Sequence, residues 1–191
     1  MVEGSHRAGG LQNRPDRLWA HRKGHGAAAG PFGCELFYDS AHRKDPETEK
    51  AFSVTYLPLG ELLAACDIIS LHAAVTPQTC GMVNAAFLSQ MKNGSYLINT
   101  ARGELVDHLA VKEALFSGKL AGAGFDTLSP EPVPADHPLV RLPPEVEDRV
   151  VFSPHLGGIT ASSFCRAHRH MWSNVVRVFN GFQPDSIVNA L

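Results

Sequence analysis

The chain has 191 residues, of which 44% are hydrophobic and 19% are charged, and its formal net charge is −2 at pH 7. This composition is typical of a globular protein with a hydrophobic core of ordinary size. The small net charge argues against nucleic acids and anionic membranes as partners, and no apolar run approaches the ~18 residues that a membrane span requires.

The first 30 residues lack the apolar pattern of a strand or a helix, and we predict that 1–30 is irregular. The segment carries charges and glycines but not the apolar centre of a signal peptide, so we do not expect secretion. The pattern Gly24-x-Gly26-x-x-x-Gly30 imitates a phosphate-binding loop, but no strand precedes it and Pro31 would end any helix. We therefore do not expect this pattern to bind a phosphate.

From residue 31 onward, short apolar runs alternate with helical segments. The expected strands are 35–39, 67–72, 95–99, 121–125 and 149–153, and the expected helices are 59–65, 84–92, 108–117 and 160–180. Asp107 can cap the third of these helices, and six prolines keep 130–145 in a loop. This alternation predicts an α/β fold with a doubly wound parallel sheet.

Three polar residues follow strands of this expected sheet, in the order Arg102, Glu131 and His155. They stand in Asn-Thr-Ala-Arg-Gly-Glu-Leu, in Phe-Asp-Thr-Leu-Ser-Pro-Glu-Pro and in Ser-Pro-His-Leu-Gly-Gly. Parallel sheets bind ligands outside the carboxyl ends of their strands, so Arg102, Asp126 and His155 should share one edge. An arginine, a carboxylate and a histidine there can bind a carboxylate substrate and move a proton while a cofactor moves a hydride. Each residue alone is equally compatible with ordinary polar surface.

From about Pro31 onward, these motifs resemble the NAD-binding domain of the D-isomer-specific 2-hydroxyacid dehydrogenases. Residues 60–83 and the closing 181–189 fit the same pattern. The resemblance implies a Rossmann-type domain of an NAD-dependent oxidoreductase that transfers a hydride between NAD(H) and a 2-hydroxy or 2-keto acid. It implies that His155 is the general acid/base, that Glu131 favours its protonated form, and that Arg102 binds the substrate carboxylate.

The resemblance also implies cofactor-binding positions along the strand ends. Asp39 ends the second strand of the family fold, where an acid bonds the adenosine ribose hydroxyls and favours NAD over NADP. Residues 42–44, His-Arg-Lys, follow closely and can receive a phosphate. Asp126 would face the nicotinamide amide, and Ala74 replaces the usual proline of the family. The other implied cofactor-binding residues are His72, Thr79, Thr100, Ala101, Arg102, His155, Gly157 and Gly158.

Two parts of the family pattern are absent, namely the substrate domain and the G-x-G-x-x-G loop that follows the first strand. The expected organisation is therefore an irregular 1–30, an NAD-binding domain over 31–180, and a segment 181–191 that returns toward the missing domain. Read one base out of frame, the codons of residues 16–26 permit Ile-Gly-Phe-Gly-Arg-Ile-Gly-Lys-Ala-Met, which is the missing loop. We hypothesise two compensating frame errors before Pro31. As written, the chain should lack the central first strand, be poorly stable and bind NAD weakly.

The sequence leaves three functions open. The chain is a catalytic 2-hydroxyacid dehydrogenase domain, or it is a non-catalytic remnant that acts only as a nucleotide-binding module. A formate or phosphonite-type dehydrogenase of the same superfamily would share the cofactor domain. Segments 104–120 and 160–180 carry apolar stripes, which fit either a homodimer, as the family implies, or packing on the sheet.

The cysteines and the remaining histidines give no sign of a metal site or a disulfide. Cys34, Cys66, Cys80 and Cys165 form no C-x-x-C pair, so we expect buried free thiols and a cytoplasmic location. The only further histidine pair on one helix is 168 and 170, and residues two apart point to different faces. We therefore expect no bound metal.

Overall fold

The computed structural model describes residues 2–7 and 34–187, with the side chains of 2–7 and of residue 34 left out. The chain divides into two compact units, Met1–Pro154 and His155–Leu191, which are described separately. The expected glycine pattern and the hypothesised frame errors fall on residues 11–30, which lie outside the described residues.

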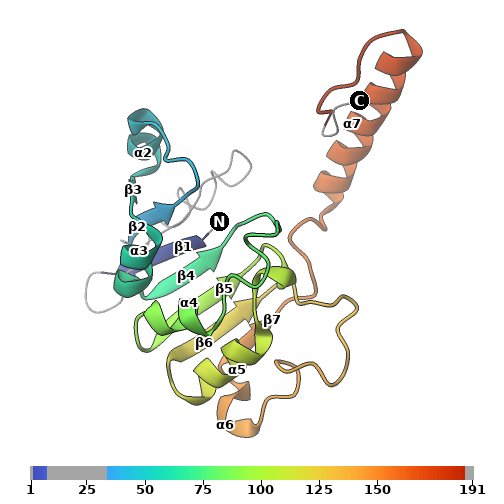
Figure 1. Cartoon of the computed structure of the whole chain (residues 1–191). Helices are drawn as coiled ribbons and strands as arrows, with labels where there is room; N and C mark the ends of the chain where they lie inside the picture. The colour runs from blue at the N-terminus through green and yellow to red at the C-terminus, as the bar shows by residue number, and fades with distance from the viewer. Residues whose placement is uncertain (1, 8–33, 188–191) are drawn as a thin grey trace. The chain divides into compact units, whose positions relative to one another are not determined.

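The first unit is built on a seven-stranded sheet with the strand order β3-β2-β1-β4-β5-β6-β7 (Figure 1). The strands are β1 Val2–Arg7, β2 Cys34–Asp39, β3 Val54–Tyr56, β4 Ile68–Leu71, β5 Ser95–Asn99, β6 Leu120–Phe125 and β7 Val150–Phe152. Every pairing is parallel except those of β1, which runs antiparallel to both β2 and β4. The predicted α/β class with a parallel sheet is confirmed, with one antiparallel strand at its centre.

The central strand corrects two expectations about the N-terminal segment. Residues 2–7 are not irregular, and the central place in the sheet is not empty, because Val2–Arg7 pairs along its length with β2. The physical reason lies in the backbone. Without a strand between them, β2 and β4 would leave unpaired N–H and C=O groups, which a strand of either direction can satisfy. The sequence Val-Glu-Gly-Ser-His-Arg shows no apolar alternation, so its pattern could not reveal this strand.

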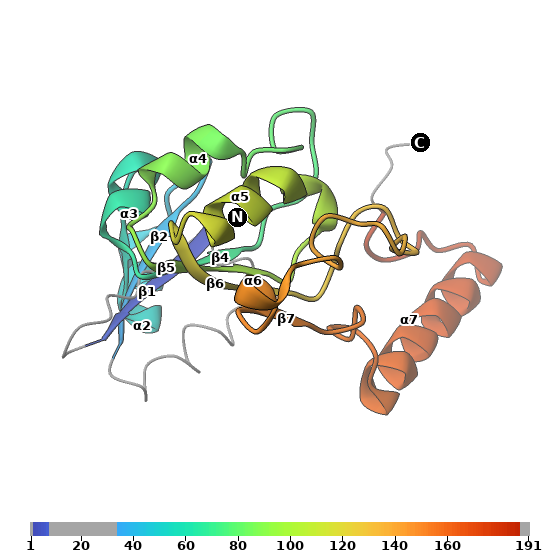
Figure 2. The ribbon, with the colours of Figure 1, turned by 90° about the horizontal axis from the view of Figure 1, so that it is seen from below.

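Helices α3 Leu59–Ala65, α4 Ala85–Gln90 and α5 His108–Phe116 cover one face of the sheet (Figure 2). The core lies between them and the strands and contains Leu62, Leu88, Leu115, Ile69 and Leu97, all buried. As predicted, the Asp107 side chain caps α5, accepting hydrogen bonds from the backbone N–H groups of residues 109 and 110 at 3.0 and 3.1 Å. The cap satisfies donors that the first helical turn leaves unpaired.

Four short elements were not predicted from the sequence. They are α2 Pro46–Phe52, β3 Val54–Tyr56, the 3₁₀-helix η3 Gly103–Leu105 and α6 Pro144–Glu147. Helix α2 had a readable start, since Asp45 caps it and Pro46 occupies the first helical position. None exceeds seven residues, so none contains enough periods of an apolar pattern to be recognised.

The second unit consists of a loop and the long helix α7 Ala161–Phe179, close to the predicted 160–180. Thr160 and Ser163 form a reciprocal capping box at its start. No residue of α7 is buried, and its apolar side chains Phe164, Trp172 and Phe179 are exposed. None of the described helices combines the length and the hydropathy that crossing a bilayer requires.

The cysteines follow the prediction only in part. Cys66 is a buried free thiol, as expected, but Cys80 and Cys165 are free and exposed. Cys80 lies in a turn at the surface of the first unit, and Cys165 lies on the exposed helix α7. The apolar neighbours that suggested burial belong to surface segments.

Candidate active site

The ends of six neighbouring strands form one row across the sheet. The paired residues are Asp39 with Val2, Val2 with Leu71, Leu71 with Asn99, Asn99 with Phe125, and Phe125 with Phe152. Every member of the row except Val2 is the last residue of its strand, so the chain leaves the sheet at this edge five times. The next residues along four of these strands are His72, Thr100, Asp126 and Ser153. Neighbouring strands are about 4.8 Å apart, so these residues lie on one edge within a short span.

The turn that carries Arg102 is fixed by the buried side chain of Asn99. The Asn99 amide donates to the Arg102 carbonyl at 2.8 Å, and its side-chain oxygen accepts from the Ala101 backbone N–H at 3.0 Å. Arg102 itself is exposed, with Nη1 donating to the Ala101 carbonyl at 2.7 Å. Asn99 thus positions both Ala101 and Arg102, a role the sequence analysis did not assign although a polar residue ends this buried strand.

Gly103 brings the Arg102 turn against the loop that carries Glu131. A Cβ at residue 103 would lie 2.2 Å from the backbone carbon of Leu128 and 2.4 Å from the backbone nitrogen of Ser129. Any side chain would therefore displace one of the two segments. Glu131 follows on this loop and is exposed. The structure thus joins the Arg102 turn and the Glu131 loop through a backbone contact that only glycine permits.

Two histidines fix the rest of this loop. The His137 ring is buried and packs edge-to-face on His108, with 4.6 Å between ring centroids. His137 Nδ1 accepts a hydrogen bond from the Leu139 backbone N–H at 3.2 Å. Burial, together with the nearby His137 charge, lowers the pKa of His108 to about 4, and burial also lowers the pKa of His137. Both rings are therefore neutral near pH 7, and they connect the start of α5 to the loop.

Asp126, the residue implied for the nicotinamide amide, is tied to the end of β7. Ser153 Oγ donates a hydrogen bond to the Asp126 carboxylate. The Asp126 backbone N–H also donates to the Asn99 carbonyl of the neighbouring strand β5 at 2.9 Å. Asp126 is thereby held between the ends of three strands. Ser153 was not singled out from the sequence, although it directly follows a predicted strand.

His155, Gly157 and Gly158 belong to the second unit, whereas Arg102 and Glu131 belong to the first. His155 is exposed and has φ of 52°, in the left-handed region. A close approach of His155 to Arg102 and Glu131 therefore stays a prediction.

The loop after β4 contains three of the expected cofactor residues. His72 is buried, and its Nε2 shares a hydrogen bond of 3.0 Å with Ser70 Oγ. Thr79 Oγ1 donates to the Ala74 carbonyl at 2.7 Å and accepts from the Thr76 backbone N–H at 2.8 Å. The Thr79 side chain thus stabilises the loop, His72 bonds back to strand β4, and Ala74 is exposed at the surface of the loop.

At the other end of the row, Asp39 is followed by a group of interacting side chains. Arg43 donates from Nε and Nη2 to the two carboxylate oxygens of Glu49 at 2.8 and 3.0 Å. Tyr38 donates to Glu49 at 2.7 Å. Burial raises the pKa of Tyr38 to about 12, and the Arg43 hydrogen bond lowers the pKa of Glu49. Arg43, one of the three residues that could receive a phosphate, is therefore already paired with a carboxylate.

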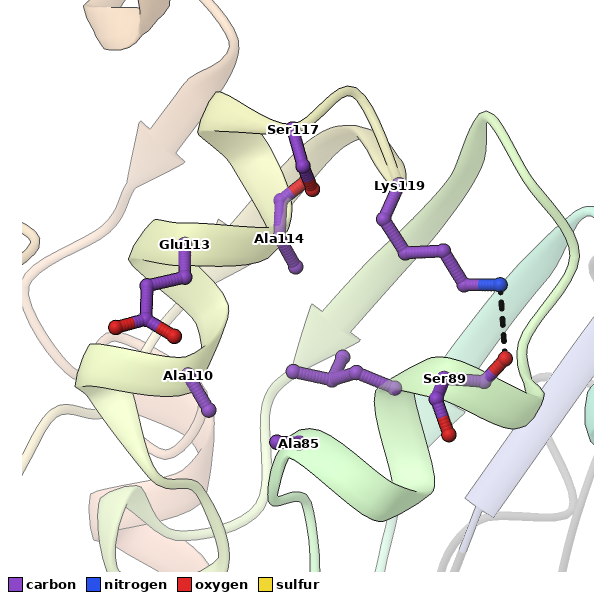
Figure 3. A pocket seen from close by; sticks show the side chains of 8 residues that line it. Ala85, Ser89, Ala110, Glu113, Ala114, Ser117 and Lys119 are labelled. Carbon is purple, nitrogen blue, oxygen red and sulfur yellow. Dashed lines mark hydrogen bonds between the residues drawn. The ribbon is translucent and has the colours of Figure 1, made fainter.

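A separate cavity of about 470 Å³ lies between α4 and α5 (Figure 3). It is lined by Leu88, Ala110 and Glu113 and by Lys119, whose Nζ donates to the Ser89 carbonyl at 2.9 Å. None of the expected site residues lines this cavity. In the part of the chain that the structure describes, no three metal-ligating side chains gather into a site.

Comparison with known proteins shows to which family this chain belongs. The family model "D-isomer specific 2-hydroxyacid dehydrogenase, NAD binding domain" matches residues 25–157. The chain belongs to this family, and NAD is the cofactor of the matched domain. The resemblance drawn from the sequence is confirmed, and the match begins slightly before the expected Pro31.

Among its relatives are the dehydrogenase efuE of Hormonema carpetanum and a glyoxylate reductase of Korarchaeum cryptofilum. They are 38% and 37% identical over 84% and 81% of this chain, but the matches cover only 39% and 44% of their own lengths. Apo D-mandelate dehydrogenase of Rhodotorula graminis superposes with a TM-score of 0.81 and 29% identity, over 92% of this chain and 50% of that chain. D-lactate dehydrogenase with NAD+ from Lactobacillus jensenii gives 0.77 and 29%, over 88% and 52%.

Proposed function

We propose that this chain is the cofactor-binding part of an NAD-dependent oxidoreductase that interconverts 2-hydroxy and 2-keto acids. The observation that supports this most is the single row of strand ends that carries Asp39, Asp126 and the Arg102 turn. Relatives of this chain carry the names glyoxylate reductase and formate dehydrogenase, which are both oxidoreductases, and glyoxylate is a 2-keto acid.

Within the described part of the chain, the residues at this sheet edge are suited to bind NAD. Asp39 would accept hydrogen bonds from the adenosine ribose hydroxyls. Thr100, Ala101 and Asp126 would border the nicotinamide half, with Ser153 fixing the orientation of the Asp126 carboxylate. Gly157 and Gly158 would add main-chain contacts. When bound, NADH supplies the hydride that reduces the carbonyl carbon.

Each catalytic residue then has one chemical task. Arg102 would bind the substrate carboxylate through two parallel hydrogen bonds, which orients the adjacent carbonyl. His155 would donate a proton to the carbonyl oxygen during reduction and accept it during oxidation. Glu131 would stabilise the imidazolium of His155 by its negative charge.

The decisive experiment separates cofactor binding from turnover. The purified chain is titrated with NADH by fluorescence and is then assayed for NADH oxidation with glyoxylate as the 2-keto acid. We expect His155→Ala to lower kcat/KM by about 10²–10⁴-fold, the usual contribution of a general acid. The matched control is His168→Ala, an exposed histidine of α7, which should leave turnover unchanged. Equal turnover in the His155→Ala variant would refute the assigned chemistry.

A nucleotide-binding module without turnover is the second candidate function. It is favoured by the exposure of both Arg102 and Glu131, because hydride and proton transfer are faster in a site that excludes water. NADH binding without oxidation by any short 2-keto acid would support this second candidate.

We also propose a homodimer in a reducing, cytoplasmic compartment. Exposed Leu109 and Phe116 on α5 and the apolar side chains of α7 are available for a subunit contact. The free thiols of Cys66, Cys80 and Cys165 suit a reducing environment. Sedimentation equilibrium at micromolar concentration tests the dimer, and a monomer mass would contradict it.

A further inference from the structure

The cofactor preference of this fold depends on charges near the end of the second strand. A carboxylate there bonds the ribose hydroxyls of NAD, and a nearby arginine can instead accommodate the 2′-phosphate of NADP. This chain has both groups, because Asp39 ends β2 and Arg43 follows four residues later. The identity of these two residues therefore does not decide the preference, and their partners must be considered.

Arg43 forms a two-point ion pair with Glu49 of α2, while the Arg43 side chain stays 63% exposed. Its Nε and Nη2 donate to Oε1 and Oε2 of Glu49 at 2.8 and 3.0 Å, and the guanidinium lies 5.4 Å from the centre of the Tyr56 ring. A guanidinium binds a carboxylate or a phosphate with the same pair of donors. The contact with Glu49 thus occupies one donor edge of the guanidinium and neutralises the charge that would attract a 2′-phosphate.

Glu49 is in turn held in place from two sides. Tyr38 donates at 2.7 Å to Oε1 of Glu49, the oxygen that also accepts from Arg43 Nε. The Tyr38 hydroxyl in turn accepts from the Lys44 backbone N–H at 2.8 Å. Asp45 caps the start of α2 by accepting from the Thr48 backbone N–H at 2.7 Å. The side chain of Glu49 is only 14% exposed. These contacts fix both the helix and the carboxylate opposite Arg43.

We propose that Glu49 is a specificity-determining residue that excludes NADP by holding Arg43 in this ion pair. The inference rests on the proposed function, because it requires the adenosine ribose to bind at Asp39. A 2′-phosphate would have to compete with the Glu49 carboxylate for Arg43 and would be repelled by its negative charge. His42 and Lys44 can contribute only a background attraction that is the same in every variant compared below.

The test compares the affinities of NADH and NADPH in the unsubstituted chain and four variants by fluorescence titration. Glu49→Gln keeps the size of the side chain and an acceptor for Tyr38 but removes the charge that binds Arg43. We expect it to tighten NADPH binding by about tenfold, because Arg43 without its carboxylate partner can bind the 2′-phosphate. NADH binding should change less than twofold. The matched control is Glu47→Gln, an exposed position of the same helix, which removes the same charge and should leave the ratio unchanged.

Arg43→Ala supplies the second arm of the test. With Glu49 present, the charge of Arg43 is neutralised by the ion pair, so Arg43→Ala should change NADPH affinity less than twofold. In the Glu49→Gln background the same substitution should abolish the tenfold gain. The first of these two comparisons also works if Glu49→Gln does not fold, because it needs only the chain with Glu49 intact.

Two results would overturn the inference while leaving the proposed function in place. They are an unchanged NADPH to NADH ratio in folded Glu49→Gln, and a tenfold loss of NADPH affinity on Arg43→Ala with Glu49 present. Failure of the unsubstituted chain to bind NADH would instead refute the proposed function, and the inference with it.

Discussion

At the scale of single residues, the geometry of the Arg102 turn depends on two neighbours that contact no substrate. Asn99 fixes the turn through two hydrogen bonds, and Gly103 allows the backbone at Leu128 to approach. Because Glu131 follows on the same loop, a change at Gly103 alters the separation of the two proposed catalytic residues. Glycine is required here for close approach and not for a special backbone angle.

We therefore predict that Gly103→Ala destabilises the first unit by about 2–3 kcal/mol, since a Cβ would overlap backbone atoms of another segment. The free energy of unfolding is measured by urea denaturation. The control is Gly60→Ala in α3, where a Cβ would lie 3.7 Å from the Gln90 side chain. This control should stabilise the protein by about 0.5–1 kcal/mol, because alanine favours the helix. Equal stability of Gly103→Ala and the unsubstituted chain would contradict the close contact.

The same residue scale shows what the sequence could and could not predict about the site. The strand-end positions of Asp39, Asp126 and Arg102 follow from the alternation of strands and helices, because parallel strands end at one edge. The pairing of Arg43 with Glu49 depends on helix α2, which is too short to show an apolar period. Contacts between segments far apart in sequence, such as that of Gly103, leave no local pattern.

At the scale of elements, the strongest link between a helix and the proposed catalytic loop is the pair His108 and His137. His108 is the first residue of α5, and His137 lies on the loop that carries Glu131. Their Nε2 atoms are buried and have no hydrogen-bond partner. Protonation would therefore place positive charge on buried rings, an effect that Asp107 moderates at His108 and that the Ser129 backbone and Asp136 moderate at His137.

This arrangement predicts a specific dependence of stability on pH. Burial lowers the pKa of His108 to about 4, whereas an unfolded histidine titrates near 6.5. Between these values the unfolded chain binds a proton that the folded chain does not, so the free energy of unfolding falls as the pH falls from about 6.5 to about 4. We expect His108 to contribute a loss of about 1–2 kcal/mol, because solvent reaches part of the ring.

Thermal unfolding from pH 7.5 to 4 measures this contribution. His108→Gln removes the titrating ring, so its melting temperature should fall less over this range than that of the unsubstituted chain. His42→Gln removes an exposed histidine and should leave the pH dependence unchanged. Identical pH profiles of His108→Gln and the unsubstituted chain would show that the pair does not titrate as described.

The elements themselves were predictable where they are long or strongly patterned. Strands β2 and β4 to β7 and helices α3, α4, α5 and α7 lie close to their predicted positions, since each shows an apolar run or period. Strand β1 was not predictable, because its pairing satisfies the backbone of its neighbours and does not depend on an apolar pattern. An apolar sequence pattern indicates the burial of side chains and does not indicate stabilisation by backbone pairing.

At the scale of the whole molecule, the direction of β1 bears on how the first unit can bind a dinucleotide. Val2, the first residue of the strand, pairs with Asp39 and Leu71 at the edge where the other strands end. The strand therefore begins at the proposed binding edge and ends at Arg7, on the opposite edge. In a dinucleotide-binding fold the first strand ends at the binding edge, and a glycine loop then presents a helix N-terminus to the pyrophosphate. The antiparallel β1 cannot deliver such a loop from its end.

The hypothesis of two frame errors before Pro31 leads to a direct prediction about this strand. The DNA across codons 11–30, read in the shifted frame, should encode a strand followed by G-x-G-x-x-G. A chain with that segment should bind NADH at least about tenfold more tightly, because backbone N–H groups and the helix dipole then bind the pyrophosphate. It should also unfold at a higher temperature, since a parallel central strand would add its apolar side chains to the core.

Fluorescence titration with NADH and thermal unfolding of both chains test this prediction. The control carries the shifted segment with its three loop glycines replaced by alanine, which should keep the gain in melting temperature and lose the gain in affinity. The gain in affinity requires close approach of the backbone to the pyrophosphate, whereas the gain in stability requires only the strand. A shifted frame without the glycine pattern, or a restored chain that binds NADH no better, would refute the frame-error hypothesis and leave the antiparallel β1 as the native centre of the sheet.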